Sequence, residues 1–346
     1  MQQCFKLITQ SKMIKLFKNI RKNLIAEGKT TNYLKYAIGE IVLVVIGILI
    51  ALQINNWNEN RKTKKEIIYS LEKISADLNR DINYLGNIIN EGEKLDSLAN
   101  LIIAKKYNLG NMSDREKIKL FLTGLQYSPF NYTTAGYERL EKLDGSIPAE
   151  YNDVFEQINT HYNSVAPVLI KLNDKQSDEI ESHHHYLAQN EAWYSKFRLG
   201  EFTKEAEDFF TSNPIYINWI TQFKISQSGR KNGVLHALRG SCIATLLKVN
   251  KTLGKSNQKI EKLVKKVPDK FSNISGSYYS KLDDNNFKVE IIDGFLLVDG
   301  MVYSYEGELE FKSFGFGIKL KFIKENNSYT LYTNDFFKDI EATQQK

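Results

Sequence analysis

The sequence Tyr36–Ile54, YAIGEIVLVVIGILIALQI, decides the fold of this chain. Its central part, Ile41 to Leu52, contains twelve consecutive residues without a polar side chain. As an α-helix this stretch would extend roughly 28 Å at ~1.5 Å per residue, close to the ~30 Å hydrocarbon core of a bilayer. We therefore predict a transmembrane helix over residues 36–54.

Two other interpretations of this apolar stretch are a cleaved signal peptide and a buried core helix. A signal peptide lies nearer the N-terminus and ends in an A-x-A-like site of small residues. Here the stretch ends in LQINNW (Leu52–Trp57), which is a poor cleavage site. A retained membrane anchor is the favoured interpretation, with the lipid bilayer as its partner.

Basic residues are concentrated before the apolar stretch. Residues 1–35 contain eight Lys or Arg and one acid, Glu27, whereas four basic residues follow within residues 61–65. Because the flank richer in Lys and Arg stays in the cytoplasm, we predict a single-pass protein of the cytoplasmic (inner) membrane. Its N-terminus would be cytoplasmic, its bulk periplasmic and Trp57 at the far interface. Residues 13–26 form either a basic amphipathic helix on the lipid surface or a solvated arm.

The net charge of the whole chain is +6. The basic arm over residues 1–35 alone contributes +7, so the remainder, at −1, is close to neutral, and nucleic acid is not predicted as a partner. The two cysteines, Cys4 and Cys242, fall on opposite sides of the predicted span and cannot pair. A disulfide-stabilised fold is therefore excluded.

The segment after the anchor has helical periodicity. Apolar residues step by three or four from Ile67 to Ile89, and again from Tyr151 to Leu172. Ser113–Glu116 has the sequence of a capping box, and Asn213-Pro214 is typical of the start of a helix, here a mostly helical stretch to about Lys265. These patterns predict an antiparallel helical bundle.

After Pro268 the spacing of apolar residues changes from the helical period to the alternation that is typical of strands. Phe287–Ile291 and Ile318–Phe322 alternate, and Asp293-Gly294 and Asp299-Gly300 are turn signals. We predict about six antiparallel strands in a small sheet or partly closed barrel, and hence a mainly α fold with a β-rich C-terminus. The predicted domains are a basic cytoplasmic arm over 1–35, the transmembrane helix over 36–54, the helical bundle over 55–265 and a β-rich domain over 268–340.

Three consecutive histidines, His183 to His185, are the most evident metal-ligand candidates. Glu181 and His185 have the i, i+4 spacing of ligands on one helix face, but adjacent residues point in different directions. One helix face supplies at most two ligands, so a solvated polar face is the favoured interpretation and no metal or cofactor is predicted. Cys242 has no nearby histidine in the sequence and is interpreted as a small buried residue. No motif predicts a catalytic residue.

Glu40 lies one turn inside the apolar stretch, where an ionisable group is a candidate functional residue. Gly47 and Ala51 have the small-xxx-small spacing that lets transmembrane helices approach closely. Together these residues predict self-association of the anchor, with a homo-oligomer as the result.

The stretch from Met13 to Lys62 resembles the N-terminus of a family of uncharacterised single-pass membrane proteins known mainly from Bacteroidota, domain of unknown function family 6090. The resemblance is most specific at Tyr36–Glu40 and Ala51–Trp57, and a second similar segment is Thr134-Ala-Gly-Tyr-Glu-Arg-Leu140. It covers about residues 13–175. It implies a membrane anchor followed by an extracytoplasmic helical domain, and it implies no known activity.

The function favoured by these observations is that of a non-enzymatic envelope protein that binds an unknown partner protein or ligand. Two alternatives remain open. One is an envelope enzyme with a site between bundle and sheet, which needs acids or histidines that converge in a pocket. The other is an extracytoplasmic sensor that acts through a partner.

Overall fold

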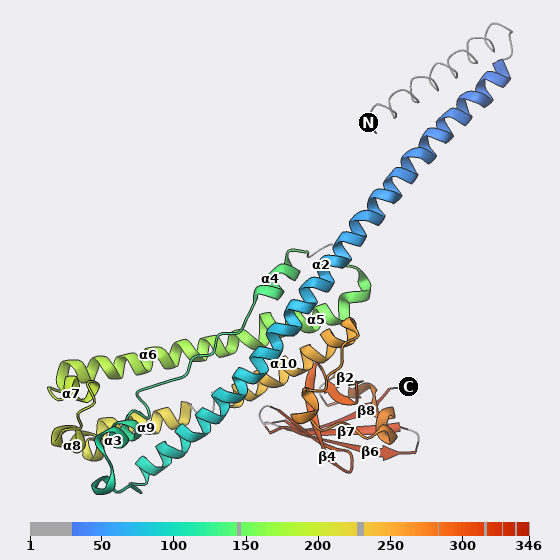
Figure 1. The fold of residues 1–346 in the computed structure, drawn as a ribbon. Coiled ribbons are helices and arrows are strands. Elements are labelled where there is room, and N and C mark those ends of the chain that lie inside the picture. Colours follow the sequence, from blue (N-terminus) through green and yellow to red (C-terminus); the bar gives the residue numbers. More distant parts are fainter. Residues whose placement is uncertain are drawn as a thin grey trace, which may run out of the picture. The chain divides into compact units, whose positions relative to one another are not determined.

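The computed structural model describes residues 30–143, 147–226, 232–282, 284–314, 317–326, 328–335 and 338–345. The predicted residues 13–26 and Cys4 lie outside them. The chain divides into two compact units, Met1–Lys65 and Glu66–Lys346. The second unit contains most of the helices and a C-terminal antiparallel barrel (Figure 1). The predicted fold class, mainly α with a β-rich C-terminus, is confirmed.

Long helices dominate the described residues. The α-helices are α2 (Thr30–Ile103), α3 (Asp114–Phe121), α4 (Ala135–Glu141), α5 (Asn152–Thr160), α6 (Ala166–Asn190), α7 (Tyr194–Arg198), α8 (Lys204–Ser212), α9 (Pro214–Lys224) and α10 (Asn232–Leu253). Short 3₁₀ turns cover Leu109–Asn111, Ala149–Tyr151, Ile260–Lys262 and Asp269–Ile274. A π-helical turn, His161–Val165, joins α5 to α6.

The apolar residues that recur every three or four positions form the core of the helical region. On α2 the predicted face from Ile67 to Ile89 is buried, and it packs in one cluster with Ile158, Tyr162 and Leu169 from the second predicted seam. A separate cluster, rich in Phe, Tyr and Trp, joins α3 to the segment between His185 and Lys224. Burial of these two faces holds the helices of the second unit together.

Local sequence signals begin two helices as predicted. Ser113 and Glu116 form a complete capping box at α3, and the side chain of Asn213 caps α9 ahead of Pro214. The predicted helical stretch to about Lys265 is wrong at its end, because α10 stops at Leu253. Gly254 follows with φ of +64°, a left-handed conformation that commonly terminates a helix.

Eight strands close into a barrel, each paired with its neighbours in chain order and the last with the first. They are β1 (Gly276–Ser280), β2 (Asn285–Ile292), β3 (Phe295–Val298), β4 (Met301–Gly307), β5 (Glu310–Ser313), β6 (Lys319–Glu325), β7 (Ser328–Asp335) and β8 (Lys338–Gln344). Both predicted Asp-Gly turns are present, with positive φ at each of their residues. The sequence predicted about six strands, and it carries no direct signal for the pairing of β1 with β8 that closes the barrel.

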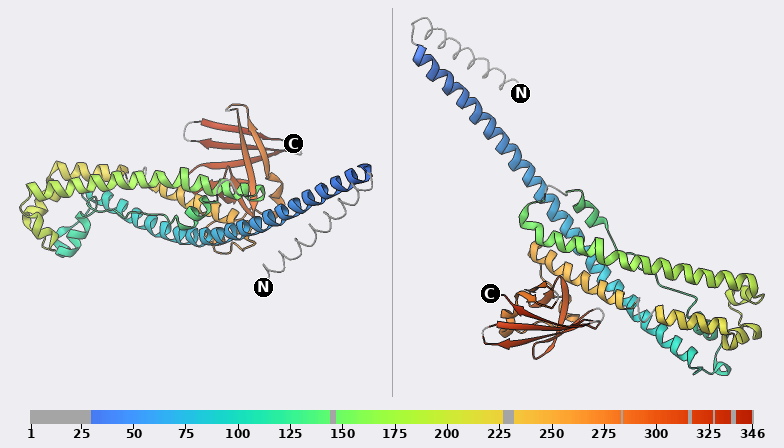
Figure 2. Two further views of the ribbon diagram at one scale, coloured as in Figure 1. Left: turned by 90° about the horizontal axis from the view of Figure 1, so that it is seen from above. Right: turned by 180° about the vertical axis from the view of Figure 1, so that it is seen from behind.

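One side of the barrel is covered by α10 (Figures 1 and 2). Strand β3 is buried on both faces: Leu296 and Val298 fill the barrel interior, whereas Phe295 and Leu297 belong to the core of the helical region. Every residue of α10 from Gly240 to Asn250 is buried. The barrel therefore packs through an apolar outer face onto a helix that is enclosed on all sides.

Polar contacts reinforce this packing. The ammonium of Lys248 on α10 lies 2.9 Å from Asp153 on α5 and 3.1 Å from Glu290 on β2, and the ammonium of Lys288 contacts the same two carboxylates. Burial raises the pKa of Asp153, but hydrogen bonds from Lys288 and Lys248 outweigh it, so this pKa lies below its usual value. Four charges thus connect two helices to one strand.

Candidate membrane anchor and ligand groove

The apolar stretch of α2 is exposed along its whole length. The twelve large aliphatic side chains between Ile38 and Ile54 are 46–64% exposed, and none of the most apolar window is buried within the molecule. Full burial of a Leu, Ile or Val side chain gains roughly 1.5–3 kcal/mol, and these half-exposed side chains forgo a large part of that gain in water. This is the one helix among the described residues that is long and apolar enough to cross a membrane.

The predicted anchor residues are distributed along this helix. A Cβ added at Gly47 would meet no other atom within 4 Å, and Ala51 is exposed, whereas Glu40 is half-buried. Trp57 is exposed, with the guanidinium of Arg61 5.3 Å from the centre of its ring. Self-association through Glu40, Gly47 and Ala51 stays a prediction.

The three histidines of α6 point to different surroundings. His183 is buried and stacks on Trp219 with 4.1 Å between ring centres. His184 contacts the hydroxyl of Tyr194 at 2.6 Å and the carbonyl oxygen of Leu125 at 2.9 Å. His185 is exposed and lines a shallow cavity with Glu181. No group of three His, Cys, Asp or Glu side chains suited to a metal occurs among the described residues.

A buried polar cluster, absent from the sequence-based candidates, lies where α5, α10 and the π turn meet. His161 Nδ1 is 2.9 Å from Ser241 Oγ, and its Nε2 is 3.8 Å from Cys242 Sγ. Burial lowers the pKa of His161 to about 4 and raises the pKa of the Cys242 thiol well above its usual value. Both side chains are fully buried and neutral at pH 7, so this pair is suited to packing rather than to nucleophilic attack.

The segment from Thr134 to Leu140, the second region of family resemblance, includes most of α4 and has a structural role there. Gly136 lies so close to α2 that an added Cβ would be 2.8 Å from the backbone nitrogen of Ile74. Just before α4, the backbone N–H of Thr133 donates to the buried carboxylate of Asp81 at 3.2 Å. Tyr137 stacks on Tyr162 with 4.7 Å between ring centres. These contacts hold α4 against α2 and the π turn.

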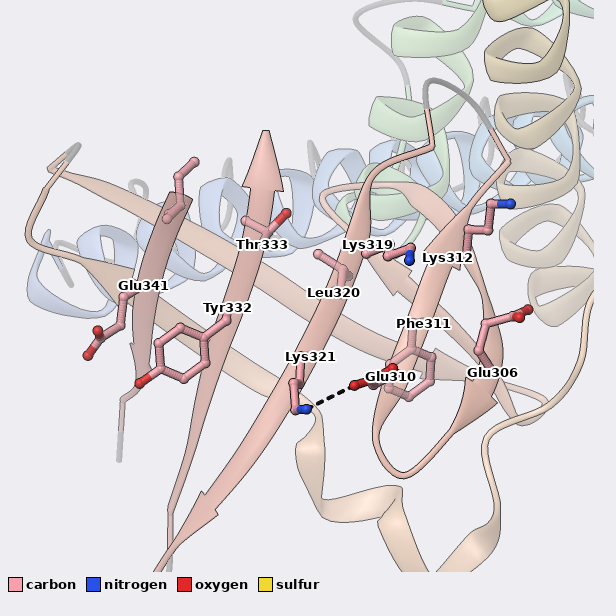
Figure 3. A pocket seen from close by; sticks show the side chains of 11 residues that line it. Glu306, Glu310, Phe311, Lys312, Lys319, Leu320, Lys321, Tyr332, Thr333 and Glu341 are labelled. Carbon is pink, nitrogen blue, oxygen red and sulfur yellow. Dashed lines mark hydrogen bonds and ion pairs between the residues drawn. The ribbon is translucent and has the colours of Figure 1, made fainter. Parts of the chain in front are cut away.

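The barrel carries a groove of about 740 Å³ across strands β4 to β8 (Figure 3). We call it the barrel groove; it is lined by Glu306, Glu310, Phe311, Lys312, Lys319, Leu320, Lys321, Tyr332, Thr333, Ile340 and Glu341. Phe311 and Leu320 are buried in the barrel interior, whereas the lysines and glutamates are exposed on the outer face. A cavity of this size fits a small organic molecule.

Charges in the barrel groove follow the strand register. Glu310, Lys321, Tyr332 and Glu341 are successive partners across β5, β6, β7 and β8. Within this row Lys321 Nζ lies 2.9 Å from Glu310 Oε1, and the hydrogen bond and ion pair lower the pKa of Glu310. The next row along the strands places Lys312 directly opposite Lys319.

A second cavity of about 390 Å³ adjoins the barrel groove. It shares Lys312 and Glu306 with the groove and is also lined by His236 of α10 and by Ser304 of β4. Burial lowers the pKa of His236, and the charges of Arg239 and Lys312 act in the same direction, opposed by Glu93. The two cavities are thus neighbours that have Glu306 and Lys312 in common.

Comparison with known proteins finds a similarity for part of the chain. Residues 40–139 match the model of a family of unknown function, DUF6090. This region is similar to that uncharacterised domain family. The match includes the apolar stretch of α2 from Glu40 onward and the Thr134–Arg139 segment, and it ends before α5 and the barrel. No curated protein and no solved structure matched the chain.

Proposed function

We propose that this protein is a non-enzymatic binding protein anchored in the cytoplasmic membrane by residues 36–54. Its N-terminus lies in the cytoplasm, and its helical region and barrel lie outside. The observation that carries the proposal is the row of exposed aliphatic side chains on α2. Water is an unfavourable solvent for such a surface, and a bilayer is a favourable one.

The barrel groove supports the binding part of the proposal. Its lining includes apolar residues as well as exposed charged side chains, and such a mixture is typical of a site that holds a ligand by a few directed contacts. By contrast, the titratable pair His161 and Cys242 is closed to solvent. This contrast favours ligand capture over chemistry at the buried cluster.

The anchoring part is tested by alkaline carbonate extraction of membranes from cells that express the full chain. We expect the wild-type protein to remain in the membrane pellet. Replacing Val44, Ile46 and Leu49 by Lys should release the protein, because each central Lys costs about 2.5–3.5 kcal/mol of insertion free energy. The matched control replaces the same residues by other aliphatics (Val44→Leu, Ile46→Leu, Leu49→Ile) and should stay in the pellet. A wild-type protein found in the carbonate supernatant would refute the anchor.

A further inference from the structure

Directly after its apolar stretch, α2 carries a short polar segment that is rich in basic residues. Residues 55–65, NNWNENRKTKK, contain four Lys or Arg against one acid, Glu59, which gives the segment a net charge of +3. Basic residues on the flank that leaves the cytoplasm weaken the charge bias that orients an anchor. An anionic lipid surface beside the anchor offers these residues a favourable contact.

Arg61 and Trp57 lie on one face of this segment. They are four positions apart and therefore neighbours on the helix surface, and the guanidinium carbon of Arg61 lies 5.3 Å from the centre of the Trp57 ring. Side chains of a helix tilt toward its N-terminus, so Arg61 reaches back toward the apolar stretch. Both side chains are exposed, and Arg61 makes no ion pair within the part of the chain that the structure describes.

The acid of the segment is engaged on another face of the helix. Lys62 Nζ lies 2.9 Å from Glu59 Oε1. At ~100° per residue, Lys62 lies about 140° from Trp57 around the helix axis. The charges of Lys62 and Glu59 thus offset each other away from Arg61, and the guanidinium over Trp57 keeps its positive charge and its N–H donors for another partner.

The position of Arg61 and Trp57 along α2 matches the headgroup layer of a membrane. If the span ends at Ile54, Trp57 lies roughly 4.5 Å and Arg61 roughly 10 Å beyond it, at ~1.5 Å per residue. The headgroup layer on each side of the hydrocarbon core is about 5–8 Å thick. Because Arg61 reaches back to the ring of Trp57, its guanidinium would lie within this layer, at the depth of the lipid phosphates.

We propose that Arg61 and Trp57 bind the phosphate of an anionic phospholipid in the leaflet opposite the N-terminus. The inference rests on the proposed membrane anchoring and adds the chemical class of a lipid partner. A guanidinium presents its donors in a planar fork that matches two oxygens of a phosphate, and the indole N–H of Trp57 is a further donor. A zwitterionic headgroup would bring a second cation next to Arg61, whereas an anionic headgroup does not.

The test uses the fluorescence of Trp57 in the full chain, reconstituted in bilayers that mix phosphatidylglycerol with phosphatidylcholine. One lipid at a time carries bromine close to its glycerol, which quenches a neighbouring tryptophan. Subtracting the quenching measured for Trp57→Phe removes the contributions of Trp193 and Trp219, which belong to the aromatic cluster of the helical region. We expect phosphatidylglycerol to be preferred about fivefold next to Trp57, as for about 1 kcal/mol from one basic residue near an anionic surface.

Two matched variants separate a specific site from diffuse attraction. Arg61→Gln should remove most of the preference for phosphatidylglycerol. Lys62→Gln removes the same charge at the neighbouring position, on the face of Glu59, and should retain the preference. Equal losses in the two variants, or a wild type without any preference, would overturn the proposal. Both variants should stay in the pellet in the carbonate extraction, where failure of the anchor itself would appear separately as release of the wild type.

Discussion

At the scale of single residues, the buried polar cluster around His161 is part of the core. The ring nitrogens of His161 face Ser241 and Cys242, and the rings of His161 and Tyr162 lie nearly perpendicular with 4.7 Å between their centres. A neutral imidazole fits this site, and an imidazolium would lose its hydration without gaining a carboxylate partner. The site therefore makes the stability of the fold depend on pH.

We predict that stability falls as the pH is lowered from 7 to 4. The pKa of His161 is about 4 in the fold against 6.5 in a model compound, so the unfolded chain binds the proton first and the folded state is disfavoured between these values. The expected loss is roughly 3 kcal/mol at most. Denaturant unfolding of the full chain at pH 7, 5.5 and 4 measures it.

The matched control for this prediction is His161→Gln, which keeps a polar group near Ser241 but does not titrate. Its unfolding free energy should fall less steeply than that of the wild type over the same pH range, because contributions from other groups are common to both proteins. Parallel slopes for the two proteins would contradict the role assigned to His161.

Sequence patterns predict those interactions whose two partners lie close together along the chain. The capping pair Ser113 and Glu116 and the two Asp-Gly turns are of this kind, because their geometry is set within a few residues. His161 and Cys242 are separated by 81 positions, and neither carries a local signal of the other. Their contact depends on the packing of α5 against α10, which one sequence does not specify.

At the scale of elements, α10 is the connection between the helical region and the barrel. Gly240 marks a close approach, because an added Cβ would lie 2.9 Å from the Cβ of Phe314, which follows β5. Gln157 on α5 adds a hydrogen bond of 3.1 Å to the carbonyl oxygen of Gly300 in the β3–β4 turn. The β-rich domain predicted over 268–340 thus shares an apolar surface with the helices, and its boundaries stay a prediction.

We predict that Gly240→Ala destabilises the full chain. Alanine normally favours a helix over glycine by up to about 1 kcal/mol, but here the added methyl group pushes α10 from the barrel, at a cost of about 1–3 kcal/mol. The control is Gly110→Ala in the exposed Leu109–Asn111 turn, where the nearest atom to the new Cβ would be 3.4 Å away. Equal unfolding midpoints for the two variants would contradict close packing at Gly240.

Helical periodicity predicts the buried face of α2 between Ile67 and Ile89 well because the core residues there recur every three or four positions. It does not predict the π turn at His161–Val165, which precedes Pro167 near the start of α6. Proline lacks the N–H that would continue the helical hydrogen bonds, so a kink near this residue is predictable. The form of the kink depends on the buried side chains around it.

At the scale of the whole molecule, the sequence predicts the anchor more fully than the groove. The apolar stretch is a continuous signal of composition, and its exposure in the structure agrees with it. The barrel groove draws its lining from β4 to β8, so its charges come together only through strand register. Lys312 and Lys319 are seven positions apart and become direct partners through the β5–β6 pairing.

The measurement that tests the central claim most directly is the location of the C-terminus relative to the membrane. Alkaline phosphatase, which is active outside the cytoplasm, and green fluorescent protein, which fluoresces when folded in the cytoplasm, are fused separately after Lys346. Eight basic residues before the span and four after it predict an active phosphatase and a dark fluorescent protein. Fusions to a chain truncated after Thr30, ahead of the span, serve as the control and should give the opposite pattern. A fluorescent C-terminal fusion with inactive phosphatase would contradict the claim that α2 carries the barrel across the membrane.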